Sequence, residues 1–507
     1  MVARAFTVAF EGIDARIVEV QCATAPGLPG FAIVGLPGKA VAEARERVRA
    51  ALTALQIALP PKKITINLSP ADLPKAGSHY DLPIALALLS AMGILPSERV
   101  EKIIALGELS LDGTLIDVPG TLPAALSAAE TGRDLICPHA SGPGAAWINA
   151  NAVYAPKNLH AVIRHLTGQA PLDTAKPGTA EDIKSTKDFK DVKGQHRGKR
   201  AMEIAAAGHH HTFLLGPPGS GKSMLAARLP GILPPLLPAE ALETSLISSL
   251  SGQGASDGIS RQRPFREPHH TASIAALSGG GRDAKPGEVS LAHNGVLFMD
   301  EFPEFPSIAL DTLRQPLETG SISVARVNAH VRYPCRFMLV AAANPCKCGH
   351  LQDLGRACNK APICGENYLG RVSGPLMDRF DLRAEIPPVA WQDLSNQEEG
   401  EASAEIAQRV AQAREIQTKR YEDHLGVSTN AMAEGRLLEE IAAPDTPGRD
   451  LLNKFSEKFG LSARGYHRVL RVARTIADLE GVPDVQERHI GEAVSYRLIA
   501  AREKIAS

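Results

Sequence analysis

The stretch Gly216-Pro217-Pro218-Gly219-Ser220-Gly221-Lys222-Ser223 decides the fold class of this chain. It fits the G-x-x-x-x-G-K-[ST] pattern of a phosphate-binding loop. A strand-like run at 212–215 precedes it, and a helical pattern at 224–229 follows it. A strand, a glycine-rich turn and a helix N-terminus together make an anion site, because backbone N–H groups point inward. We therefore expect all eight residues to contact a nucleotide, with Lys222 on its β- and γ-phosphates and the Ser223 hydroxyl on Mg²⁺.

The composition is that of a globular protein with several domains. At 507 residues the chain exceeds a single core, which predicts about three domains. The net charge is −1, so any nucleic-acid site must be a local basic patch. The longest apolar stretch, 82–95, is too short to span a membrane. The seven cysteines are odd in number and four of them cluster late in the chain, which indicates a reduced, cytoplasmic protein.

The chain divides into domains and one linker. Residues 1–168 alternate strand-like and helical runs, which predicts an α/β layer domain. Residues 169–188 turn polar and read as a linker. Residues 189–388 carry the phosphate-binding loop, and the pattern of residues 389–507 is almost purely helical. In the first domain we expect strands at 6–10, 17–21, 63–68 and 103–106, and helices at 40–55, 83–92 and 121–129.

A second chemical element is the run Val296-Leu297-Phe298-Met299-Asp300-Glu301. Four apolar residues predict a buried strand, and its two carboxylates fall at the carboxyl end, where ligands bind in such sheets. We expect Asp300 to hold Mg²⁺ through water and Glu301 to polarise the attacking water. The alternative is a strand that simply ends in an acidic turn.

Three further residues complete the predicted catalytic set. Asn344 follows another apolar strand at 337–343 and would orient the lytic water. Arg379 lies in an otherwise apolar helix–strand junction, either as a salt-bridged surface residue or as an arginine finger that acts on a neighbour's γ-phosphate. Arg464 begins a helix and suits a second phosphate-sensing arginine. Most of the arginines that follow it at helical spacing are expected on a solvated face: Arg468, Arg471 and Arg474.

Four cysteines stand close together, with the spacing C-x-C-x₉-C-x₅-C: Cys346, Cys348, Cys358 and Cys364. Glycines and a proline between them predict an irregular loop, and four thiolates in one loop suit a structural Zn²⁺ site. His350 could replace one thiolate. The alternatives are a reduced, metal-free loop or a redox pair. Three isolated cysteines are expected to be buried: Cys22, Cys137 and Cys335.

These elements resemble the AAA+ ATPases of the magnesium-chelatase-like group and, within it, the ComM (YifB) family. The resemblance implies an AAA+ core with a helical lid, ATP and Mg²⁺ as cofactors, and a homo-hexameric ring. It also implies Walker A residues Lys222 and Ser223, Walker B residues Asp300 and Glu301, sensor Asn344, finger Arg379 and second sensor Arg464. Beyond the motifs above, it rests on Pro264-Phe265-Arg266-Glu267-Pro268-His269-His270-Thr271, Leu277 to Gly281, Pro286 to Gly295, and Asn344-Pro345-Cys346-Lys347-Cys348-Gly349.

Two insertions of the central domain, residues 189–388, carry basic residues. The glycine-rich segment 273–288 holds Arg282 and Lys285, and the segment 319–333 predicts a β-hairpin that holds Arg326. In the clade that the chain resembles, such elements project into the pore of the ring. These three residues are therefore candidates for DNA-backbone contacts, against the alternative of ordinary surface charges.

The N-terminal domain resembles the ribosomal-S5-like domain of Lon-type proteases in the segments 74–83 and 107–113. His79 stands where that family has its serine, Ser78 is one place off, and no lysine follows at 119–123. A serine without an activating base is inert, so we expect an α+β domain with no peptidase activity.

The expected function is ATP-driven translocation on single-stranded, forked or branched DNA. Within the family that the chain resembles, this activity is that of a helicase or branch-migration motor. The resemblance also implies recombination proteins as partners and natural transformation as the biological process. Two alternatives remain: a magnesium-chelatase motor subunit and an ATP-gated scaffold that remodels proteins.

Overall fold

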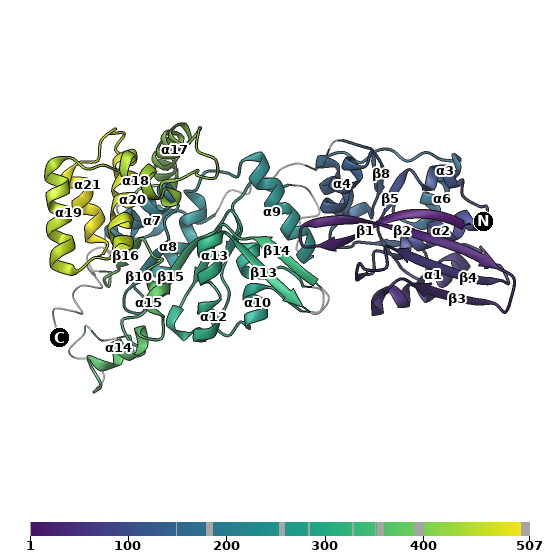
Figure 1. The fold of residues 1–507 in the computed structure, drawn as a ribbon, viewed down its shortest axis with the longest axis horizontal. Helices are drawn as coiled ribbons and strands as arrows, with labels where there is room; N and C mark the ends of the chain where they lie inside the picture. Colours follow the sequence, from purple (N-terminus) through teal and green to yellow (C-terminus); the bar gives the residue numbers. More distant parts are fainter. Residues whose placement is uncertain are drawn as a thin grey trace.

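The computed structural model describes residues 2–148, 150–178, 186–252, 259–281, 284–326, 329–349, 351, 359–389 and 400–497. Three parts follow one another along the long axis of the molecule (Figure 1). The N-terminal domain lies at one end, the domain with the phosphate-binding loop lies in the middle, and the C-terminal helices lie at the other end.

The N-terminal domain is built on a seven-stranded sheet in the order β3-β4-β2-β1-β5-β8-β9. Its longest strands, β1 (Val2–Glu11) and β2 (Asp14–Ala25), form an antiparallel hairpin. The other strands are β3 (Gly30–Val34), β4 (Lys63–Ser69), β5 (Ile103–Ala105), β8 (Asp134–Ile136) and β9 (Val153–Tyr154), with the small pair β6 (Glu108–Leu109) and β7 (Leu115–Ile116) beside them. The helices are α1 (Lys39–Ala54), α2 (Asp81–Ala91), α3 (Ser97–Val100), α4 (Thr121–Glu130), α5 (Gly142–Ala145) and α6 (Leu159–Thr167).

The strands and helices predicted for this domain are present, with bounds that agree to within a few residues. The run Leu82–Ser90 of α2 is apolar on nearly every side and is buried throughout, so this helix forms the centre of the core. Three strands of this sheet were missed, the short β3, β8 and β9. For example, β3 is a run of only five residues that follows Pro29, and it becomes a strand by pairing parallel with β4. Such tertiary pairing leaves little trace in local periodicity.

The central domain contains a five-stranded parallel sheet in the order β11-β12-β15-β10-β16. Its strands are β11 (Phe265–Arg266), β12 (Val296–Met299), β15 (Met338–Ala343), β10 (Thr212–Leu215) and β16 (Leu382–Glu385). All four neighbouring pairs are parallel, so the carboxyl ends of the strands share one edge. Helices surround the sheet: α7 (His196–Gly208), α8 (Lys222–Arg228), α9 (Pro238–Ser251), α12 (Ser307–Asp311), α13 (Arg314–Thr319), α14 (Ile363–Leu369) and α15 (Gly374–Met377).

Two insertions of the central domain pack together. The predicted hairpin is confirmed as β13 (Ser321–Arg326) and β14 (Ala329–Pro334), with its turn at 327 and 328 outside the described residues. The glycine-rich segment 273–288 includes α10 (Ile274–Ser278) and ends at the start of α11 (Glu288–Leu291). The Tyr333 hydroxyl donates a hydrogen bond to the Ala284 carbonyl at 3.0 Å, which fixes the segment against the hairpin.

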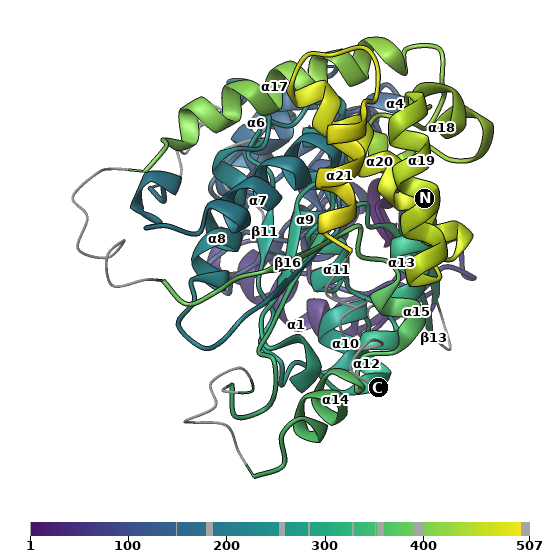
Figure 2. The same ribbon diagram turned by 90° about the vertical axis from the view of Figure 1, so that its left-hand side faces the viewer.

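The C-terminal helices form a lid over the central domain. They are α17 (Ser403–Arg420), α18 (Gly435–Ile441), α19 (Thr446–Phe459), α20 (Ala463–Leu479) and α21 (Glu487–Ser495). Figure 2 views this end of the molecule, where α17 and α20 both pack on α7. The apolar residues of these helices and of the sheet form one continuous core. The fold class is thus an α/β P-loop core with a helical lid, preceded by an α+β domain.

The N-terminal domain touches the central domain at two places. The turn of the β1–β2 hairpin lies on β14, because a Cβ atom on Gly12 would come within 2.7 Å of Val331 Cγ1. Phe10 and Ile13 pack against the apolar cluster of the central domain. At the second place the Gly120 N–H donates to the Ser249 carbonyl at 3.1 Å, beside the end of α9. Among the described helices, none is long and apolar enough to cross a lipid bilayer.

Candidate active site

The phosphate-binding loop connects the carboxyl end of β10 to α8, as the sequence predicts. Gly219 and Gly221 adopt left-handed backbone conformations, with φ of +74° and +89°, which side chains with a Cβ rarely adopt. The Lys222 ammonium lies under the loop and donates hydrogen bonds to the carbonyls of Gly216 at 2.8 Å and Pro217 at 2.9 Å. The lysine is therefore held by the loop that a phosphate would enter.

Burial shapes the electrostatics of this lysine. It lowers the pKa of Lys222, and the carboxylates of Asp300 and Glu301 act in the opposite direction. A partly desolvated cation attracts an anion more strongly than one in water. The site therefore favours a phosphate next to the Lys222 ammonium.

The acidic end of β12 meets the loop directly. The Ser223 hydroxyl donates to Asp300 Oδ2 at 2.6 Å, although the two residues are 77 positions apart. A hydroxyl and a carboxylate at this separation fit the ligands that Mg²⁺ takes beside nucleotide phosphates. These two residues would hold the ion, and the bound Mg²⁺ would neutralise charge on the phosphates.

Glu301 has an unusual backbone and an unpredicted partner. Its φ is +50°, a left-handed conformation that is uncommon outside glycine and clusters at functional sites. Its Oε2 lies 3.3 Å from Nδ1 of His270, whose ring is 4.2 Å from that of His269. His270 was not predicted to be a site residue, because the Pro-His-His stretch carried only the family resemblance. The feature that could have indicated it is its position just after β11, the strand next to β12.

Asn344 comes to the same place from β15. Its Oδ1 accepts a hydrogen bond from Lys222 Nζ at 3.2 Å. The reason is the strand order, in which β15 lies between β12 and β10, so that Asn344 projects beside the loop. Lys222, Ser223, Asp300, Glu301 and Asn344 therefore form one cluster at the carboxyl edge of the sheet.

Arg379 lies beyond the amino ends of the strands, on the side of the sheet opposite to the cluster around Lys222. It stands three residues before β16, and β16 runs parallel to β10 from Thr212↔Leu382 to Leu215↔Glu385. The phosphate-binding loop follows the carboxyl end of β10, whereas Arg379 precedes the amino end of β16. Four strand residues span about 13 Å at roughly 3.3 Å each, so the arginine and the loop of one chain are well separated. Its present partner is Glu318, with which it forms an ion pair.

Arg464 lies near Arg379 and not with the loop residues. Burial is the main cause that lowers the pKa of Arg379, and the positive charges of Arg464 and Arg468 lower it further. The expectation for the arginines after Arg464 is wrong for two of them, since Arg468 and Arg474 are buried. Arg468 pairs with Asp381, a carboxylate on a distant segment that local helical spacing does not reveal, and Arg474 pairs with Asp478 one turn further along α20.

The cysteine loop begins against the phosphate-binding loop. Cys346 Sγ and Cys348 Sγ are 3.1 Å apart, and a Cβ atom on Gly349 would meet Pro218 at 2.5 Å. Cys358 and His350 lie outside the described residues. Within the part of the chain that the structure describes, no cluster of three or more metal-binding side chains is present. Cys22, Cys137 and Cys335 are buried, as predicted.

The candidate DNA contacts belong to the two packed insertions. Lys285 is exposed, and its backbone bridges to Gly280 within the glycine-rich segment. Arg282 lies outside the described residues, and Arg326 is the last residue of β13. A Cβ atom on Gly279 would lie 3.2 Å from Val324 of β13, so segment and hairpin form one surface.

In the N-terminal domain, His79 is a core residue. It is buried, its Nε2 lies 2.9 Å from the Val8 carbonyl oxygen, and burial lowers its pKa to about 4. The ring is therefore neutral and packs between Phe10 and Tyr80. Lys75 is also buried and donates to the Pro70 carbonyl.

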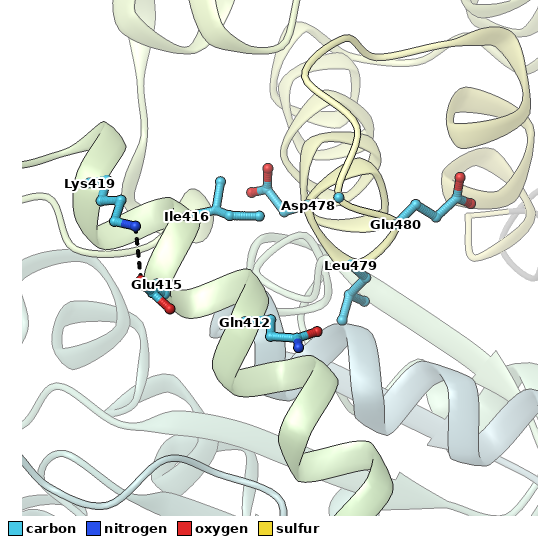
Figure 3. A pocket seen from close by; sticks show the side chains of 8 residues that line it. Gln412, Glu415, Ile416, Lys419, Asp478, Leu479 and Glu480 are labelled. Atoms are coloured by element: carbon cyan, nitrogen blue, oxygen red, sulfur yellow. Dashed lines mark ion pairs between the residues drawn. The ribbon is translucent and has the colours of Figure 1, made fainter.

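A separate depression of about 370 Å³ lies on the lid, between α17 and the end of α20 (Figure 3). Its lining includes Gln412, Ile416 and Leu479, and an ion pair of 2.9 Å joins Lys419 to Glu415 at its rim. None of the residues that line it belongs to the cluster around Lys222.

A phosphate-binding loop, an acidic strand end and a helical lid on a parallel sheet define a P-loop ATPase of the AAA+ class. Three family descriptions match consecutive parts of the chain. These are "Magnesium chelatase, subunit ChlI" over residues 188–394, "Subunit ChlI of Mg-chelatase" over 18–141, and "Magnesium chelatase, subunit ChlI C-terminal" over 400–497.

Relatives narrow this class further. The chain is 43% identical over 492 residues to Competence protein ComM of Haemophilus influenzae, covering 96% of this chain and 95% of that protein. It is 44% identical over 489 residues to protein YifB of Escherichia coli, with the same coverage. The Magnesium-chelatase 38 kDa subunit of Rhodobacter capsulatus is more distant, at 23% identity over 61% of this chain and 87% of that subunit. The chain belongs to the ComM/YifB family of magnesium-chelatase-like AAA+ ATPases.

Proposed function

We propose that this protein is a homo-hexameric motor that uses ATP to move along DNA and promotes branch migration when incoming DNA is recombined. Glu301 polarises the attacking water, Asn344 orients it, and Lys222 with the Mg²⁺ ligands Ser223 and Asp300 binds the phosphates. Arg379 and Arg464 reach the γ-phosphate held by a neighbouring subunit. Such a motor would work in the cytoplasm.

One observation supports assembly into a hexameric ring. The cluster around Lys222 and the arginines Arg379 and Arg464 occupy opposite ends of the same sheet. A site that needs both is completed only when a second copy of the chain presents its arginines. Closed rings follow when such a head-to-tail contact repeats with a rotation that closes.

The DNA substrate has separate support. The hairpin β13–β14 and the glycine-rich segment pack together, and the sequence puts Arg282, Lys285 and Arg326 within these two segments. Contacts from such residues to phosphates are independent of base sequence, as a moving motor requires. The name of the Haemophilus influenzae relative, a competence protein, supports incoming DNA as the substrate.

We further propose that the cysteine loop holds a structural Zn²⁺ through Cys346, Cys348, Cys358 and Cys364. The first two sulfur atoms lie side by side, which supports one metal ion bound between them, since thiolates are preferred ligands of zinc. The loop touches Pro218, so a zinc ion would hold it beside the nucleotide site.

The test is an ATPase, strand-displacement and branch-migration assay on the full chain with forked and four-way DNA. We expect ATPase stimulation by both DNAs, displacement of the labelled strand and movement of the four-way junction. Glu301→Gln serves as the inactive control. A wild-type ATPase that ignores DNA and moves neither substrate would overturn the proposal.

The second candidate is a motor subunit for inserting Mg²⁺ into a porphyrin, which the 23% identity to a magnesium-chelatase subunit favours. It predicts ATPase activity that responds to a partner chelatase subunit and not to DNA. The same ATPase assay, with DNA or with that partner added, separates the two.

A further inference from the structure

The segment 379–383, which runs from the end of α15 into β16, contacts the lid at three of its residues. The Phe380 carbonyl accepts from the Arg497 guanidinium at 2.7 Å. The buried Asp381 carboxylate lies 3.3 Å from the Arg468 guanidinium on α20. The Arg383 N–H donates to the Tyr496 carbonyl at 3.0 Å. The chain is therefore fixed to the lid helices at the point where it enters the sheet.

Asp381 is the centre of this attachment. Its Oδ2 lies 3.0 Å from His210 Nδ1, and the other nitrogen of that ring lies 2.8 Å from Thr475 Oγ1 on α20. Burial alone would raise the pKa of Asp381, but the hydrogen bond from His210 and the charges of Arg471 and Arg468 hold it below its usual range. The carboxylate is thus charged and bonded on both sides, to the core through His210 and to the lid through Arg468.

The polar connection continues into the lid. Thr475 Oγ1 accepts from the Asn430 side-chain amide at 3.0 Å, and the same amide donates to Asp478 at 2.8 Å. Arg474 and Arg420 pair with Asp478 in turn. A buried network of this kind holds one arrangement, because any displaced member would leave an unpaired charge or donor.

Arg379 is two residues before Asp381, and Arg464 is one helical turn before Arg468. The two arginines proposed to reach the neighbour therefore flank one ion pair. Within the described residues, Nε of Arg379 and one terminal nitrogen of Arg468 are buried and have no hydrogen-bond partner.

We propose that Asp381 is a positioning residue that fixes Arg379 and the first turns of α20 as one rigid unit, so that the lid of each subunit sets the arginines offered to the next subunit. This inference rests on the proposed function, since it assumes that Arg379 acts on a neighbour. Movement of a lid would then advance or withdraw both arginines together.

The test uses Asp381→Asn in the full chain, a change that keeps the shape and removes the charge. ATP affinity should stay within about twofold, because the phosphate-binding loop lies at the other edge of the sheet. The kcat should fall about a hundredfold, the effect of displacing a catalytic group by about 1 Å. Equal loss of ATP affinity and kcat would overturn the inference.

A mixing experiment excludes a merely structural effect. Asp381→Asn subunits keep an intact nucleotide site, and Glu301→Gln subunits keep intact arginines. A mixture of the two should therefore hydrolyse ATP several times faster than the sum of the separate variants. A mixture of Arg379→Ala and Glu301→Gln is the reference. If the reference recovers activity and the Asp381→Asn mixture does not, the role of Asp381 is refuted. If the reference also fails, the shared site of the proposed function is refuted.

Two further variants complete the design. Asp478→Asn removes a carboxylate that is equally buried in the same network but lies away from the segment 379–383. It should lower the melting temperature while keeping kcat within about threefold, and a loss as large as that of Asp381→Asn would contradict the inference. If Asp381→Asn does not fold, Arg468→Gln breaks the same ion pair from the lid side and is tested in the same mixture.

Discussion

The Ser223 hydroxyl donates a hydrogen bond to Asp300 Oδ2 at 2.6 Å, and this contact joins the phosphate-binding loop to the acidic end of β12. The two side chains converge because β10 and β12 end at the same edge of a parallel sheet, with only β15 between them. Neither residue alone indicates catalysis. Together they supply the oxygen ligands that a Mg²⁺–nucleotide complex uses.

Replacing Lys222 with alanine should weaken ATP binding roughly tenfold to a hundredfold. A hydrogen bond to a charged group is worth about 1.5–3 kcal/mol, and each 1.4 kcal/mol is a factor of ten in affinity. Titration with a fluorescent ATP analogue measures the effect. The matched control is Lys454→Ala, an exposed lysine on α19. Unchanged affinity in the Lys222 variant would contradict the assignment of the loop.

Glu301→Gln should bind ATP with normal affinity and lose at least a hundredfold in kcat, since a general base contributes about 10²–10⁴. Single-turnover hydrolysis and nucleotide titration separate the two effects. Glu304→Gln, three residues further along, is the control and should retain its rate. Normal hydrolysis by Glu301→Gln would show that another group activates the water.

Arg379→Ala should leave ATP affinity intact and lower kcat about a thousandfold, the usual contribution of an arginine finger. Wild-type specific activity should also fall on dilution, because a monomer lacks the neighbour's arginine. Arg371→Ala removes a nearby arginine that pairs with Glu304, and it should have little effect. An ATPase rate per chain that is independent of protein concentration would contradict a shared site.

Neutralising Arg282 and Arg326 together should weaken binding to forked DNA and reduce its salt dependence. Each lost phosphate contact lowers the slope of log affinity against log salt by about one, so the double variant should lose about two. Fluorescence anisotropy over a salt series measures this slope. A double alanine variant of two exposed arginines, Arg436 and Arg488, provides the control. An unchanged slope would reject the hairpin as a DNA contact.

Freshly purified protein should contain about one zinc per chain, because a structural site is close to fully occupied. Cys346→Ser should lower this value to less than half, whereas Cys335→Ser, at a buried and isolated cysteine, should not. Elemental analysis before and after chelator treatment gives the ratio. Less than roughly half a zinc per chain in fresh wild-type protein would exclude the site.

Local sequence could predict the elements whose geometry is set by neighbouring residues. The phosphate-binding loop, the acidic strand 296–301 and the hairpin 319–333 were all found this way, because turn glycines and apolar runs act over a few positions. His270 was missed, since its contact with Glu301 depends on β11 lying beside β12. The burial of Arg468 was missed for a similar reason, because its carboxylate partner is 87 positions away.

The sequence by itself determined the phosphate-binding loop, since the run 216–223 between a strand and a helix has the glycines and the lysine that this turn requires. Only the tertiary structure decided which of the predicted site residues lie together and which lie apart. The parallel order of the sheet puts Lys222, Asp300 and Asn344 at one edge and Arg379 at the other. Strand order is fixed by packing between distant segments, which no local pattern encodes, and it is this order that separates Arg379 from Lys222 within one chain.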